Sequence, residues 1–147
     1  MSVTEPLAED QRSYAWDLLV RPREIERWRN EVAGALRSMG AAPEAVGLAR
    51  LGISELLSNV VKHVPDPRCR LHVLRAGDAV LVQLHDRSRA IPVIPAEEPD
   101  PESPTGRGLW LLRQIATALG YTETADGKAV WFRTPLRPDP DREPFPA

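Results

Sequence analysis

The segment from Leu48 to Val64 constrains the fold more than any other, because it divides its residues between two faces of a helix. The apolar face is a stripe of residues three and four positions apart: Ile53, Leu56, Leu57, Val60, Val61 and Val64. Such a stripe predicts a helix that is buried along one side against the core. The opposite face carries polar residues at similar spacings: Glu55, Asn59, Lys62 and His63.

This polar face has two interpretations. A solvated helix surface often carries polar residues three and four positions apart, where they stabilise the helix weakly. The alternative is a binding site, because carboxylate and amide oxygens suit Mg2+ and a nearby lysine or histidine suits phosphate. The binding interpretation predicts a nucleotide site, so the rest of the chain must then supply phosphate-binding glycines and a group that recognises a base.

Length and composition limit the possible classes of protein. The chain has 147 residues, of which 42% are hydrophobic, and a formal net charge of −2. These values predict one domain with a sizeable core, and they argue against a basic surface for nucleic acid. Lys62 and Lys128 are the only lysines, and Cys69 is the only cysteine, so one chain forms neither a disulfide nor a cysteine metal site.

No segment of the sequence indicates secretion or a membrane. The N-terminal residues lack the basic and apolar regions of a secretory signal. No run approaches the ~20 apolar residues that span a bilayer. We therefore expect a cytoplasmic protein with no membrane partner.

Periodicity and turn residues predict the order of elements along the chain. The elements are a strand over 13–20, a helix over 24–39, a helix from Pro43 or Glu44 to before Pro65, strands over 70–75 and 79–85, a helix over 109–119 and strands over 121–124 and 129–133. Antiparallel pairs and three amphipathic helices predict an α+β two-layer sandwich with the helices on one face of the sheet. The ordered domain is expected over 13–134, between a flexible N-terminus, 1–12, and a flexible tail, 135–147.

A proline-rich loop interrupts this pattern. Residues 91–105 contain five prolines and four acidic residues, which disfavour both a helix and a central strand. A loop of this length inside a compact domain is usually functional or disordered. A lid over a ligand, formed by 92–105, and a plain solvent loop are both open interpretations.

Glycines flank an arginine directly after this loop. Gly106 and Gly108 free the backbone at the start of the helix expected from Leu109, where unpaired N–H groups attract phosphate. Arg107 between them would add a phosphate contact. A tight turn with a surface arginine explains the same residues.

Asp86 follows a predicted apolar strand and precedes Ser88 by two positions. A carboxylate at a strand end can accept a hydrogen bond from an exocyclic amine such as that of adenine, with Ser88 helping. The alternative is a turn-forming aspartate that bonds to the backbone two residues later.

Taken together and in this order, these motifs resemble those of a known family. Three groups of residues resemble the N, G1 and G2 boxes of the Bergerat-fold (GHKL) ATPases, the histidine kinase-like ATPase domains. The N box corresponds to Glu55, Asn59, Lys62 and His63, the G1 box to Asp86 and Ser88, and the G2 box to Gly106-Arg107-Gly108-Leu109. Within that superfamily the chain looks most like the anti-sigma factor serine kinases, over about residues 13–134. The resemblance implies a mixed, mostly antiparallel sheet covered on one face by three helices.

The resemblance also implies roles for individual residues and for two cofactors, ATP and Mg2+. Asn59 would hold Mg2+, Glu55 would orient or deprotonate the attacking hydroxyl, and Asp86 would accept the adenine amine. The phosphate side would be lined by Gly106, Arg107, Gly108 and Leu109, under a lid made by 92–105. Lys62 and His63 match positions near the nucleotide, although a histidine in the last turn of a helix also has an ordinary capping role.

The sequence departs from the family pattern at two positions. Ser88 and Ala90 replace glycines of the usual G1 box, so the backbone approaches the base edge less freely and nucleotide affinity is expected to suffer. None of the three histidines, His63, His72 and His85, lies in a separate dimerisation helix, which argues against autophosphorylation on histidine.

Two functions from different classes follow. The first is a protein serine kinase that phosphorylates a small anti-sigma factor antagonist protein and sequesters a sigma factor, with a homodimer as one assembly seen in relatives. The second is a non-catalytic regulatory module that binds a partner and uses nucleotide, if at all, as a structural ligand. An ATP hydrolase of larger machinery is a weaker third option.

Overall fold

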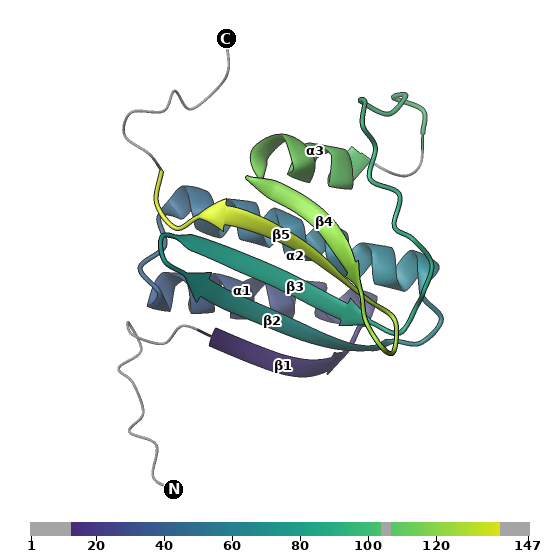
Figure 1. Ribbon diagram of the computed structural model, residues 1–147, viewed down its shortest axis with the longest axis horizontal. Coiled ribbons are helices and arrows are strands. Elements are labelled where there is room, and N and C mark those ends of the chain that lie inside the picture. The colour runs from purple at the N-terminus through teal and green to yellow at the C-terminus, as the bar shows by residue number, and fades with distance from the viewer. Residues whose placement is uncertain (1–12, 104–106, 139–147) are drawn as a thin grey trace, which may run out of the picture.

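The computed structural model describes residues 13–103 and 107–138, which form two layers (Figure 1). The elements in chain order are β1 (Ser13–Leu19), a 3-10 turn (Pro22–Glu24), α1 (Ile25–Ser38), α2 (Pro43–His63), β2 (Arg68–Ala76), β3 (Ala79–Asp86), α3 (Arg107–Ile115), β4 (Ala118–Glu123) and β5 (Lys128–Pro135). This arrangement confirms the predicted α+β sandwich. No helix in these two ranges is both long and apolar enough to cross a membrane.

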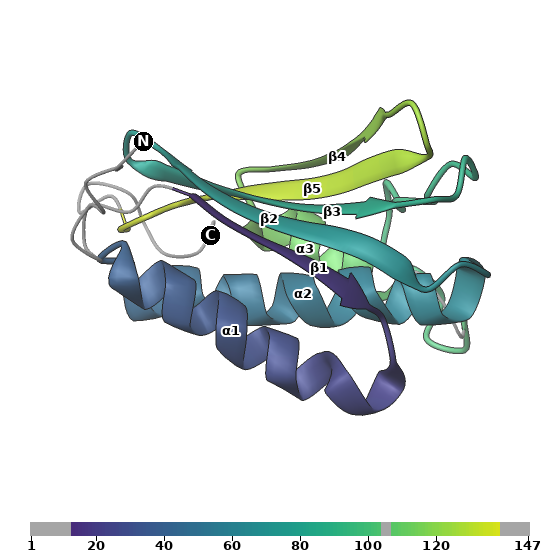
Figure 2. The same ribbon diagram turned by 90° about the horizontal axis from the view of Figure 1, so that it is seen from below.

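The sheet has the strand order β1-β2-β3-β5-β4, with β1 and β4 at its edges. All four pairings are antiparallel, so the sheet is not mixed as the resemblance implies. The hairpins β2–β3 and β4–β5 account for two pairings, and β5 returns to pair with β3. The helices lie against one face of the sheet, and the described residues leave the other face without a helix (Figure 2).

The apolar stripe of α2 forms the centre of the core. Its buried members are Ile53, Leu56, Leu57 and Val60. Val61, which the sequence places in the same stripe, is 41% exposed. At about 100° per residue, Val61 lies about 80° round the helix axis from Ile53, so it leaves the buried face. The buried stripe is therefore narrower than predicted.

Gly52 allows α2 to approach the sheet closely. The ring of Phe132 on β5 is fully buried, and it fills the space that a Cβ on residue 52 would occupy. Because glycine has no Cβ, the ring packs directly onto the helix backbone. This contact sets the distance between α2 and β5.

The predicted helix over 109–119 is too long. α3 ends at Ile115, and Ala118–Glu123 forms β4 instead. The change occurs where the Thr117 N–H donates to the Arg133 carbonyl at 2.8 Å, which starts the pairing of β4 with β5. Leu119 packs against the core from a strand, so helical spacing misassigned it.

The predicted tail also begins too early. Leu136 is 3% exposed and belongs to the core. Its N–H donates to the Asp78 carbonyl at 2.6 Å, and its carbonyl accepts from the Ala42 N–H at 2.9 Å. Backbone hydrogen bonds and burial hold this residue in place, which the proline content of the segment conceals. The packed domain therefore extends at least to Leu136.

Candidate functional site

A cavity of about 630 Å³ lies where the end of α2 meets the end of β3, the start of β5 and the loop after β3. Five predicted site residues line it: Asn59, His63, Asp86, Ser88 and Leu109. Four others do not line it: Glu55, Lys62, Arg107 and Gly108. Gly106 lies outside the described residues. The volume is in the range of pockets that hold small ligands.

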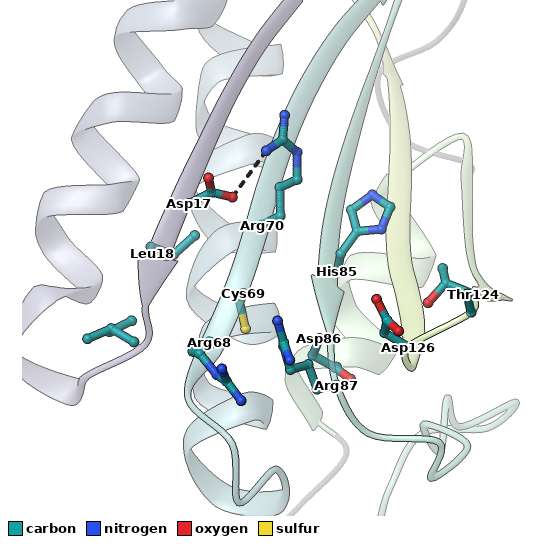
Figure 3. A pocket seen from close by; sticks show the side chains of 12 residues that line it. Asp17, Leu18, Arg68, Cys69, Arg70, His85, Asp86, Arg87, Thr124 and Asp126 are labelled. Atoms are coloured by element: carbon teal, nitrogen blue, oxygen red, sulfur yellow. Dashed lines mark hydrogen bonds and ion pairs between the residues drawn. The ribbon is translucent and has the colours of Figure 1, made fainter.

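A second hollow, of about 740 Å³, opens on the sheet face that carries no helix (Figure 3). Arg70 and His85 point into it, and two of the arginines that line it are in ion pairs. Arg70 pairs with Asp17 at 3.1 Å, and Arg68 pairs with Asp66 at 2.8 Å. We therefore place the candidate site in the first cavity, which five of the nine described site residues line.

α2 supplies two polar side chains to the cavity. Asn59 and His63 are four residues apart, so they lie one turn apart on the same side of the helix. Asn59 is half-buried, and its amide makes no hydrogen bond with a described residue. His63 is exposed in the last turn of α2, where a cation also interacts favourably with the helix dipole. His63 can therefore line the cavity and also occupy a capping position at the end of α2.

Asp86 ends β3 at the floor of the cavity and is only 5% exposed. Its Oδ1 accepts the Ser88 N–H at 2.8 Å, which is the turn that the alternative interpretation predicts. The same oxygen accepts a hydrogen bond from Lys128 Nζ at 3.1 Å. Asp86 therefore combines a turn-forming role with a place in the cavity.

Lys128 is the site residue that the sequence analysis misses. It is 6% exposed and lines the cavity, and its Nζ also donates to the Ser88 carbonyl at 3.3 Å. The register of β3 and β5 places it directly opposite Asp86. The available signal was its rarity, since it is one of only two lysines in the chain.

Gly127 brings Lys128 close to Asp86. A Cβ on residue 127 would overlap the Asp86 carbonyl oxygen and would lie 2.8 Å from the Arg87 Cα. Backbone atoms cannot move aside as a flexible side chain can, so this position requires glycine for the turn between β4 and β5 to pack here.

Ser88 and Ala90 occupy the positions where the family pattern has glycines. The Ser88 Oγ accepts the Ala90 N–H at 3.1 Å, so a side chain stabilises the turn. Within the described ranges no residue other than glycine has a positive φ, so neither position needs glycine for its backbone conformation. The altered residues thus form an unstrained turn beside the cavity.

Glu55 lies beside the cavity against the first turn of α3. Its carboxylate fills the space that a Cβ on Gly108 would occupy, so Gly108 permits this contact. Loss of water around the half-buried carboxyl raises the pKa of Glu55, and the positive charge of Lys62 partly opposes that rise. A carboxylate with a raised pKa is better suited to accept a proton. Lys62 itself is exposed.

Arg107 contacts the proline-rich loop instead of the cavity. Its guanidinium pairs with Glu98 at 3.2 Å and donates to the Pro99 carbonyl at 3.0 Å. Arg113 of the same helix donates to the Pro95 carbonyl at 3.3 Å. The loop in turn lines the cavity with Ile91, Pro92, Val93, Pro95, Pro99 and Ser103. The two arginines therefore join α3 to the wall of the cavity.

The protein oxygens in the cavity are compatible with a Mg2+ ion that is coordinated mainly by the phosphates of a bound ligand. In the described residues no three His, Cys, Asp or Glu side chains cluster in a way that could hold a metal ion. Mg2+ usually keeps several waters and takes only one or two protein oxygens together with phosphate oxygens. The unpaired amide oxygen of Asn59 is suited to be such a ligand.

Comparison with known protein families agrees with the fold. No curated protein matches the chain. The family model described as "Histidine kinase-like ATPase domain" matches residues 18–134, which include every element from the end of β1 to β5. The matched segment contains all ten predicted site residues. The chain therefore belongs to the histidine kinase-like ATPase domain family, which implies an ATP-binding protein.

Proposed function

We propose that this protein binds Mg-ATP in the cavity and transfers the γ-phosphoryl group to a serine of a small partner protein of the anti-sigma factor antagonist type. The protein would then sequester a sigma-type transcription factor when that partner is phosphorylated. The observation that carries the proposal is the convergence of Asn59 and Asp86 on one cavity, with the raised-pKa carboxyl of Glu55 beside it. Family membership supports the ATP-binding part.

Each residue would have a role that follows from its position in or beside the cavity. Asp86 would accept the amine of the base at the floor, and Asn59 would orient Mg2+, which neutralises charge on the phosphates. Glu55 would accept the proton of the attacking serine hydroxyl as the serine oxygen bonds to the γ-phosphorus. The bond from that phosphorus to the oxygen bridging the β- and γ-phosphates then breaks, and ADP leaves. The loop over 92–103 would limit access of water.

A second function, a partner-binding module without catalysis, is favoured by one observation. The Oδ1 atom of Asp86 already has two hydrogen-bond donors, Lys128 and the Ser88 N–H. A carboxylate engaged in this way is a weaker acceptor for a base. In this function nucleotide would act as a structural ligand, or would not bind.

A Glu55→Gln variant separates the two functions. The measurement is transfer of labelled phosphate from ATP to candidate partner proteins, with ATP affinity measured alongside by calorimetry. For a kinase, transfer falls about 100-fold or more while ATP affinity is retained, because a general base contributes about that factor. The matched control is Glu44→Gln, an exposed glutamate in the first turn of α2. Unchanged transfer by Glu55→Gln would remove the role of Glu55.

A further inference from the structure

Lys128 presents an unused hydrogen-bond donor at the floor of the cavity. An ammonium group has three N–H donors. Two are directed at Asp86 Oδ1, at 3.1 Å, and at the Ser88 carbonyl, at 3.3 Å. No further described residue accepts from Lys128. Because Lys128 lines the cavity, its third donor can reach a ligand there.

Asp86 presents the complementary acceptor. Its Oδ1 takes both recorded hydrogen bonds, and no described residue donates to its Oδ2. The side chain of Asp86 is 3% exposed, so water outside the cavity has little access to it. A carboxylate oxygen that has no protein donor and belongs to a side chain lining a cavity is normally satisfied by a ligand or by ordered water. The floor of the cavity therefore holds an acceptor and a donor one hydrogen bond apart.

This pair matches one edge of a 6-aminopurine. Adenine has a donor, its exocyclic amine, directly next to an acceptor, ring nitrogen N1. In the same orientation guanine would place its carbonyl oxygen against the carboxylate and its N1–H against the ammonium. Both guanine contacts would be unfavourable, because each joins two acceptors or two donors.

We propose that Lys128 donates to N1 of the adenine whose amine Asp86 accepts, and so determines the specificity of the site for adenine over guanine. The proposal rests on the ATP binding proposed above. Lys128 would then have two roles, since the ion pair also fixes the Asp86 carboxylate. The register of β3 and β5 places Lys128 opposite Asp86, so Lys128 can contact Asp86 and the adenine at the same time.

The test compares nucleotides that differ by one ring atom. Calorimetric titration of the full chain uses Mg-ATP, Mg-1-deaza-ATP, which lacks the N1 acceptor, and Mg-7-deaza-ATP as the matched control. 1-deaza-ATP should bind about 10- to 100-fold more weakly than ATP, because a hydrogen bond to a charged group is lost. 7-deaza-ATP should bind as ATP does, and GTP should bind more weakly than either.

A variant then assigns the lost bond to Lys128. Lys128→Met removes the ammonium and should bind ATP and 1-deaza-ATP equally. If Lys128→Met still prefers ATP by the wild-type factor, a group other than Lys128 contacts N1 and the proposal is overturned. Should Lys128→Met fail to give a cooperative thermal melt, Lys128→Gln replaces the charged donor with a neutral one and should prefer ATP over 1-deaza-ATP by a smaller factor than the wild type. An unchanged factor in Lys128→Gln would overturn the role of Lys128.

Failure of this inference is distinguishable from failure of the proposed function. Equal affinity of the unmodified chain for ATP and 1-deaza-ATP overturns the role of Lys128 and leaves ATP binding intact. If the unmodified chain binds none of the nucleotides at millimolar concentration, ATP binding and the role of Lys128 are both wrong.

Discussion

Glu55 and Asp86 are both carboxylates, but the protein surrounds them differently. Asp86 is buried with two donors on one oxygen, so its environment favours a fixed orientation. Glu55 is half-buried beside Gly108, with Lys62 as the positive charge that acts on it. One residue is therefore suited to hold a ligand and the other to exchange a proton.

The metal role of Asn59 can be tested directly. Asn59→Ala should lower the affinity for ATP at least about tenfold in Mg2+ and leave the affinity in EDTA unchanged, because the substitution removes an oxygen ligand. Calorimetry with and without Mg2+ measures both values. Ser58→Ala, at the neighbouring half-buried position of α2, is the control. Equal losses with and without Mg2+ would contradict the metal role.

The raised pKa of Glu55 predicts how a variant affects stability. Between the ordinary pKa of 4.5 and the higher folded value, the folded state holds a proton that the unfolded state has released, so stability falls as pH rises through this window. Glu55→Gln removes this loss. Its melting temperature should exceed that of the wild type at pH 7, and the difference should shrink towards pH 4. A constant difference at all pH values would exclude the titration of Glu55 as its cause.

At the scale of elements, two glycines control how β5 meets its neighbours. Gly52 admits the Phe132 ring against α2, and Gly127 admits the backbone of Asp86 and Arg87. Each contact joins segments that are distant in sequence. The position of Lys128 in the cavity depends on both glycine contacts. Lys128 is on β5, and these contacts set how closely β5 approaches α2 and the end of β3.

Gly52→Ala should destabilise the domain by about 1–3 kcal/mol, because the added Cβ overlaps a buried ring in a packed core. Gly47→Ala in the same helix is the matched control, since a Cβ there meets no atom within 4 Å. That control should be neutral or stabilising by up to about 1 kcal/mol, as alanine favours a helix. Urea unfolding measures both; equal effects would show that the Phe132 contact does not limit the packing.

The sequence allowed most elements to be predicted, for reasons visible at this scale. α1, α2 and the β2–β3 hairpin have regular periodicity and clear stops, such as Gly40 and Pro65. The end of α3 was misplaced because Leu119 continues a helical spacing while the Thr117 N–H already bonds to β5. Lys128 was missed because its partner is set by the pairing of β3 with β5, which local sequence does not encode.

At the scale of the whole molecule, the cavity lies at the place where the two layers and the long loop meet. α2 provides one wall, β3 and β5 the floor, and the loop after β3 another wall. Ile91 and Val93 of that loop are 64% and 79% exposed, so the loop carries apolar side chains that are not packed. This combination fits a segment that rearranges over a ligand.

The contacts of Arg107 and Arg113 with the loop give a prediction for this segment. Replacing Arg107 and Arg113 with alanine should speed amide hydrogen exchange over 91–103 without changing the melting temperature, because exposed arginine contacts contribute little to global stability. Arg133→Ala, an exposed arginine on β5, is the control. If Mg-ATP then fails to slow exchange over 91–103 in the wild type, the lid interpretation is wrong and the segment is a solvent loop.

The backbone bonds of Leu136 have a practical consequence for anyone who shortens or fuses this protein. They join the turn after β2, at Asp78, to the start of α2, at Ala42, and so fasten the C-terminal end of the last strand across both layers. The family match stops two positions earlier, at residue 134. A fragment that ends at residue 134 would lack Leu136 and its two backbone hydrogen bonds. A fusion junction should therefore be placed beyond residue 138.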